Sequence, residues 1–114
     1  MIRDLVNTKT IRLQLDAADW RDAITQAAQP MVQEGLISEG YIAGIIESAE
    51  VSGPYFVLAP HIALPHAPRE KGALKTGLGI AVLKTPVAFN SQANDPVKYL
   101  FTLSATLRCT GRTC

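Results

Sequence analysis

The chain has 114 residues, of which 47% are hydrophobic and 18% are charged. This length is typical of a single domain with one core, and the composition argues against intrinsic disorder. Eleven Lys and Arg residues balance ten Asp and Glu residues, and without a basic block the chain is not a dedicated nucleic-acid binder. The N-terminus lacks an apolar signal core, and four prolines interrupt the longest uncharged stretch. We therefore expect a cytoplasmic protein without direct membrane insertion.

The first half of the chain predicts one strand and two helices. Residues 10–15 alternate apolar and polar side chains, which is typical of a strand with one buried face. Asp16 is the expected N-cap of the first helix. Pro30 is expected to bend this helix or end it near residue 29, and Gly35 is a plausible terminator. Ser38 is the expected cap of a second helix, which stops before the Ser-Gly-Pro sequence at 52–54.

The second half predicts strands separated by turns. Apolar runs mark the expected strands at 55–59, 62–64, 78–83, 87–89 and 97–105, with turns at 69–72, 85–86 and 90–96. Gly77 and Gly79 are interpreted as strand glycines that permit close backbone approach. Two helices followed by several strands predict an α/β or α+β fold with a mixed β-sheet sandwiched by helices.

The two histidines, His61 and His66, each follow a proline in the segment 53–70. Proline stiffens the backbone on its N-terminal side, and an imidazole at a strand end on such a turn is well placed to act as a nucleophile. If residues 62–64 are extended, the two side chains point to opposite faces. From these residues alone, a histidine that only packs or hydrogen-bonds at a strand end is about equally well supported.

Other side chains point to no cofactor chemistry. Two histidines without a nearby acidic or cysteine cluster are too few for a metal site, so we expect no metal and no cofactor. Cys109 and Cys114 have a spacing that fits no trusted zinc or redox motif. Tyr41 and Tyr55 are expected to pack with their hydroxyls in water.

The run Pro65-His66-Ala67, preceded by Ile62-Ala63-Leu64 and Gly53-Pro54-Tyr55, resembles the enzyme IIA family of the bacterial phosphoenolpyruvate-dependent sugar phosphotransferase system. The resemblance is to the mannitol/fructose-type fold family and, within it, to the ascorbate-type branch. It extends over most of residues 10–106, including Pro86-Val87-Ala88-Phe89 and Asn94-Asp95-Pro96-Val97. It implies a cytoplasmic phosphocarrier that accepts a phosphoryl group from phospho-HPr and passes it to a cysteine of its enzyme IIB.

The resemblance also assigns roles to single residues. His66 would be the phosphoryl acceptor, and His61 would be a site-lining or structural residue. Arg69 is a candidate for contacting the phosphoryl group, because a guanidinium matches phosphate geometry. Relatives often read His-Ala-Arg-Pro where this chain reads His-Ala-Pro-Arg at 66–69, which favours a solvated turn residue at Arg69. An alternative function is that of a non-catalytic regulatory or protein-binding relative of the same fold, and a third is an inactive truncated product.

The match stops after residue 106. We therefore expect a C-terminally incomplete enzyme IIA-type domain at 1–106 and a divergent tail at 107–114. Relatives usually continue with an acidic segment that carries a second histidine, followed by helices that cover the sheet. An uncovered apolar sheet face predicts self-association or marginal stability.

Overall fold

The computed structural model describes residues 6–53, 55–91 and 93–106. The elements follow in the order β1 (Val6–Leu15), α2 (Trp20–Gln33), α3 (Glu39–Ser52), β2 (Val57–Ala59), β3 (Ile62–Ala63), η1 (Arg69–Lys71), β4 (Gly77–Val87) and β5 (Val97–Ser104). The strands form one sheet in the order β1-β4-β5-β3-β2. β1 runs parallel to β4, and β3 runs parallel to β5, whereas β4–β5 and β2–β3 are antiparallel. The predicted α/β class with a mixed sheet is confirmed.

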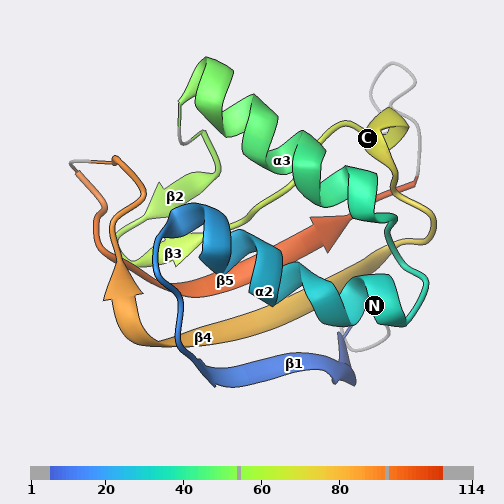
Figure 1. Ribbon diagram of the computed structural model, residues 1–114, viewed down its shortest axis with the longest axis horizontal. Coiled ribbons are helices and arrows are strands. Elements are labelled where there is room, and N and C mark those ends of the chain that lie inside the picture. Colours follow the sequence, from blue (N-terminus) through green and yellow to red (C-terminus); the bar gives the residue numbers. More distant parts are fainter. Residues whose placement is uncertain (1–5, 54, 92, 107–114) are drawn as a thin grey trace.

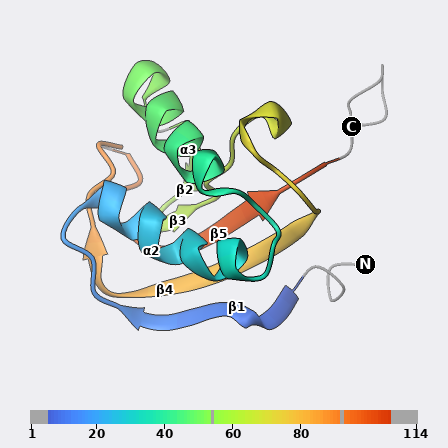
Figure 2. The same cartoon turned by 45° about the vertical axis from the view of Figure 1, so that its right-hand side comes forward.

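Both helices lie on the same face of the sheet (Figure 1), and a rotated view shows the opposite face without a helix (Figure 2). In β4 the residues toward the helices are buried and those between them are only partly buried. The core therefore fills the space between the sheet and the two helices. Its largest fully buried apolar side chains are Tyr41, Phe56, Phe89, Ile24, Met31, Ile37, Ile45, Leu83, Leu100 and Val97.

The first helix begins three residues later than the sequence predicted. Asp19, not Asp16, is the N-cap, and its carboxylate accepts a hydrogen bond from the Asp22 N–H at 2.9 Å. The Asp22 carboxylate in turn accepts from the Ala18 N–H at 2.9 Å. This reciprocal pair satisfies two backbone donors at the helix start, whereas residues 16–18 connect β1 to the helix. The prediction of Asp16 as the cap was wrong because two aspartates compete within four positions.

Pro30 does not end α2. The helix continues to Gln33, and the Glu34 N–H donates to the Pro30 carbonyl at 3.0 Å. Pro30 is buried against the core, so ring packing offsets the hydrogen bond that proline cannot donate. Gly35 then adopts a φ of +75°, which confirms it as the terminator.

β4 is longer than predicted. It continues through Thr85 and Pro86, where a turn was expected, and it ends at Val87, the first residue of the strand expected at 87–89. Val87 still pairs with Val97 in β5, and the register shifts between Val82 and Val87. Such an irregularity accommodates a proline, which has no N–H for the ladder. The close approach expected at Gly79 is confirmed, since a Cβ there would lie 2.9 Å from Met31 Sδ of α2.

Candidate functional site

His66 lies on the segment that leaves β3 and runs beside α3. The preceding Pro65 is buried, and its carbonyl accepts a hydrogen bond from the Leu103 N–H of β5 at 3.0 Å. The Nδ1 atom of His66 lies 2.7 Å from the carbonyl oxygen of Leu64. Because a carbonyl oxygen only accepts, Nδ1 carries the proton in the neutral ring, and Nε2 keeps a free lone pair.

Tyr55, three residues beyond the end of α3, contacts the same histidine. Its hydroxyl donates to the backbone carbonyl of His66, and the two rings meet edge to face with centroids 5.2 Å apart. Burial raises the pKa of Tyr55, and a hydrogen bond with the Ser48 side chain partly opposes this rise. The phenol therefore stays protonated near neutral pH and remains a hydrogen-bond donor to His66.

Tyr41 fixes the backbone that follows His66. Its hydroxyl is 2.8 Å from the carbonyl of Leu103, 3.1 Å from the N–H of Ala67 and 3.2 Å from the carbonyl of Ala67. The side chain is 1% exposed, and burial raises its pKa. The expectation of a hydroxyl in water was wrong for Tyr41, because its partners are backbone atoms that no local pattern reveals.

His66 lines a cavity of about 420 Å³. Its lining comprises Ser48, Ser52, Tyr55, His66, Ala67 and Pro68. The two serines are four residues apart and therefore lie on one face of α3. Sequence reasoning missed both serines, although the i, i+4 spacing of two hydroxyls on this helix was the available signal.

His61 and Arg69 lie outside that lining. His61 is exposed with a φ of +70°, and its Nδ1 is 2.8 Å from the carbonyl of Pro96. Arg69 is the first residue of η1. Among the described residues, the structure therefore brings Tyr55 and the α3 serines to His66, and not the second histidine or the arginine.

The comparisons with known proteins decide the family. The family model "Phosphoenolpyruvate-dependent sugar phosphotransferase system, EIIA 2" matches residues 4–110. The chain belongs to this enzyme IIA family. It is 42% identical over 105 residues to the ascorbate-specific PTS system EIIA component of Shigella boydii serotype 4 (strain Sb227), a match that covers 91% of this chain and 68% of that protein. This enzyme IIA chain thus spans about two thirds of the length of that relative.

Solved enzyme IIA structures share the fold. The solution structure of the mannitol-specific cryptic phosphotransferase enzyme IIA CmtB from Escherichia coli matches with a TM-score of 0.83 and 38% identity, covering 91% of this chain and 70% of that chain. Mannitol enzyme IIA from Escherichia coli, solved in complex with phosphorylated enzyme IIB, matches with a TM-score of 0.77 and 24% identity, over 88% of this chain and 69% of that chain.

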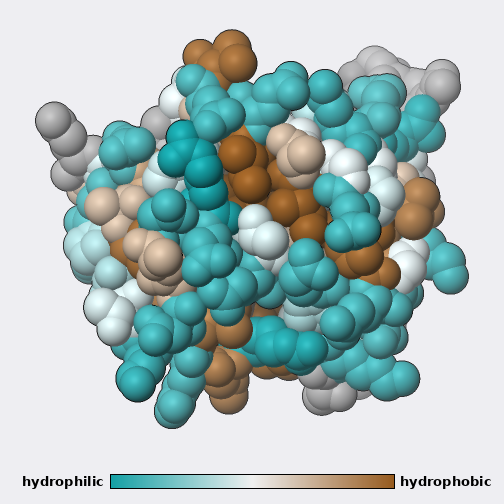
Figure 3. Space-filling model, in the orientation of Figure 1, coloured by the Kyte–Doolittle hydropathy of each residue, from teal (hydrophilic) through white to brown (hydrophobic). Residues whose placement is uncertain are grey.

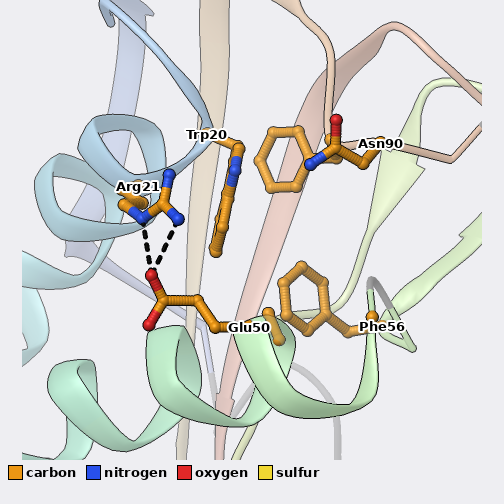
Figure 4. Close-up of a pocket in the computed structure, with 8 residues that line it drawn as sticks. Trp20, Arg21, Glu50, Phe56 and Asn90 are labelled. Carbon is orange, nitrogen blue, oxygen red and sulfur yellow. Dashed lines mark hydrogen bonds and ion pairs between the residues drawn. The ribbon is translucent and has the colours of Figure 1, made fainter.

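A second hollow of this enzyme IIA chain lies on the other side of α3, between the start of α2 and the end of α3 (Figure 4). The guanidinium of Arg21 stacks 4.4 Å from the Trp20 ring centroid and bonds the Glu50 carboxylate at 2.7 and 2.9 Å. Phe56 and Phe89 close its floor, with 0% and 2% exposure. Because its charges are paired with each other and its rings are packed, we interpret this hollow as a joint between the helices.

Two further structural findings concern the described residues alone. Within 6–53, 55–91 and 93–106, no three or more His, Cys, Asp or Glu side chains gather where they could hold a metal ion. Over the same residues, no helix is both long enough and apolar enough to cross a membrane. Cys109 and Cys114 lie outside the described part of the chain, as does the whole predicted tail.

Proposed function

We propose that this enzyme IIA chain is a cytoplasmic phosphocarrier, with phospho-HPr as donor, an enzyme IIB as acceptor and His66 as the transient phosphohistidine. The observation that carries the proposal is the hydrogen bond from His66 Nδ1 to the Leu64 carbonyl. It leaves Nε2 as the nucleophilic nitrogen of a residue that lines a cavity with room for a phosphoryl group. The ascorbate-specific name of the 42% identical relative makes an ascorbate-type system the proposed pathway of transfer.

Phosphoryl acceptance requires no proton to leave the ring. The Nε2 lone pair attacks phosphorus while the bond between phosphorus and the donor breaks. The ring becomes cationic, with Nδ1 still protonated and the Leu64 carbonyl still accepting its hydrogen bond. That bond becomes charge-assisted on phosphorylation and therefore stabilises the phosphorylated ring.

The second transfer reverses these changes. A thiolate of enzyme IIB attacks phosphorus, the bond from Nε2 to phosphorus breaks, and the neutral imidazole returns. The solved complex of a mannitol enzyme IIA with phosphorylated enzyme IIB shows such a pairing for a protein of this fold. Tyr55 and Tyr41 both hold the peptide group that joins His66 to Ala67, so the ring does not need to reorient between the two transfers.

Transfer from phosphorylated HPr, followed by intact mass at neutral and acid pH, tests the proposal. The expected result is one acid-labile phosphoryl group that is retained in His61→Ala and lost in His66→Ala. The Nδ1 atom of His61 contacts Pro96 outside the cavity, so His61→Ala is the matched control. Absence of a label on a folded chain would contradict phosphocarrier activity and favour the non-catalytic regulatory relative.

A further inference from the structure

Among the described residues, the lining of the cavity beside His66 contains no Asp, Glu, Lys or Arg side chain. Besides His66, its residues are two serines, a tyrosine, an alanine and a proline. The cations of η1 are not part of this lining, and Lys71 Nζ lies 4.0 Å from the Glu47 carboxylate. A transferring phosphoryl group carries negative charge on three oxygens, so its oxygens have to be met here by neutral donors.

Two other sources of neutral donors are already used. The Ala67 N–H donates to the Tyr41 hydroxyl at 3.1 Å, and the Tyr55 hydroxyl donates to the His66 carbonyl. In addition, α3 ends at Ser52, and a helix C-terminus places partial negative charge beside the cavity. This end of the helix would repel a phosphoryl group unless hydroxyl donors offset it.

Ser48 and Ser52 carry the remaining hydroxyls of the lining, and the Ser48 side chain also hydrogen-bonds Tyr55. They are one turn apart on α3, and Figure 1 shows the segment after β3, which carries His66, running alongside this helix. Ser52 is exposed, so its hydroxyl can turn toward a group bound in the cavity, whereas the half-buried Ser48 has to exchange its hydrogen bond with Tyr55 for one with that group. Residues with this spacing share one helix face, which lets them contact different oxygens of one phosphoryl group.

We propose that Ser48 and Ser52 bind the phosphoryl group on His66, each donating a hydroxyl hydrogen bond to one of its oxygens. This inference rests on the proposed function of His66. The Nε2–phosphorus bond forms as the donor bond breaks, and the serines exchange no atoms. Loss of one neutral hydrogen bond to the transferring group should slow phosphorylation roughly 3- to 10-fold, and loss of both should slow it further.

A small phosphoryl donor tests the serines without a protein partner. We would treat the full 114-residue chain with phosphoramidate, whose phosphorus–nitrogen bond breaks as Nε2 attacks and ammonia leaves. Intact mass would give the initial rate of labelling and the lifetime of the phosphohistidine. Ser48→Ala, Ser52→Ala and the double variant should label more slowly than the unmodified chain.

Because the Ser48 side chain also hydrogen-bonds Tyr55, slower labelling of Ser52→Ala is the result that separates contact with the phosphoryl group from positioning of His66, and two controls accompany it. Ser48→Thr keeps the hydroxyl and should label at nearly the unmodified rate, and Val51→Ala changes an exposed residue of the same helix outside the lining and should have no effect. Equal labelling rates for all variants would overturn the serine proposal alone. No label on His66 of the folded, unmodified chain would overturn the proposed function, and the serine proposal with it.

Discussion

At the scale of single residues, the site depends on hydroxyl groups that hold backbone atoms. Tyr41 reaches from α3 to Ala67 and to Leu103 of β5, which are 26 and 62 residues away in the chain. Tyr55 holds the carbonyl of His66 itself. These contacts fix the backbone that carries the imidazole, which is the arrangement that the proposed phosphoryl transfer requires.

Removal of the Tyr41 hydroxyl should lower stability. In Tyr41→Phe the Ala67 N–H and the Leu103 carbonyl lose a partner inside the core, which should lower the free energy of unfolding by about 1–3 kcal/mol. Urea denaturation measures this loss. Tyr99→Phe is the matched control, because Tyr99 is 40% exposed and water can replace its hydroxyl contacts; an equal effect of both changes would contradict the role given to Tyr41.

The buried Tyr41 hydroxyl also predicts how the free energy of unfolding depends on pH. Burial raises the pKa of Tyr41 above the ordinary value of 10.0, so the unfolded chain releases this proton at lower pH than the folded chain. The resulting stability is fully present below pH 10 and is lost as the pH rises through the folded pKa. Above about pH 10, the free energy of unfolding should fall more steeply with pH in the unmodified chain than in Tyr41→Phe, and parallel slopes would show that Tyr41 titrates alike in both states.

At the scale of elements, α2 is positioned by close contact with β4, and α3 is positioned against α2 by the joint between the two helices. Arg21 and Glu50 form the charged part of that joint, but both side chains are about half exposed, so the ion pair contributes little. The packing of aromatic rings contributes most of the stability of this joint. The Phe89 ring centroid lies 6.2 Å from that of Trp20 and 6.1 Å from that of Phe56. Figure 3 shows apolar surface along the line between the helices, framed by hydrophilic residues.

Contact between α2 and β4 predicts a large effect of side-chain size at Gly79. A Cβ there already meets Met31 Sδ at 2.9 Å, so Gly79→Val should overpack the core and cost about 1–3 kcal/mol. Thermal unfolding followed by circular dichroism would measure the loss. Ile80→Val, on the next residue and the other face of the sheet, is the control; if both substitutions cost the same, α2 does not lie against the strand as described.

How far the sequence predicts this structure differs from one element to another. The apolar periodicity of α2 and the proline before His66 are local signals, and they predicted the helix and the nucleophile candidate. The N-cap at Asp19 and the continuation of β4 through Pro86 depend on competition between neighbouring signals, which tertiary packing decides. Tyr41, Tyr55, Ser48 and Ser52 could not be assigned, because their roles depend on contacts between segments that only the fold brings together.

At the scale of the whole molecule, one face of the sheet is covered and the other is open among the described residues (Figure 2). The strand registers place these side chains on the open face: Ile11, Ile62, Leu78, Ile80, Val82, Tyr99, Phe101 and Leu103. These side chains are uncharged at neutral pH, and the alternation along β4 adds Lys84 at the end of the strand. Burial of the apolar surface would favour contact between two copies of the chain through this face.

The open face therefore predicts self-association of this 114-residue chain. Sedimentation velocity over a concentration series should show a dimer that Tyr99→Lys weakens, because the substitution places a charge at the centre of the apolar face. Val51→Lys is the control, since Val51 is 80% exposed on α3, on the covered side of the sheet. A monomer at all concentrations, with a sharp melting transition that is independent of concentration, would contradict this prediction.

The central claim is that His66 carries the phosphoryl group on Nε2, because Nδ1 is held by the Leu64 carbonyl. The most direct test is nitrogen-15 NMR of the imidazole rings in the phosphorylated chain, with coupling to phosphorus-31 used to identify the bonded nitrogen. The structure predicts coupling to Nε2 of His66, an Nδ1 that is still protonated, and an unchanged His61 ring. Coupling to Nδ1 of His66, or to either nitrogen of His61, would contradict the account.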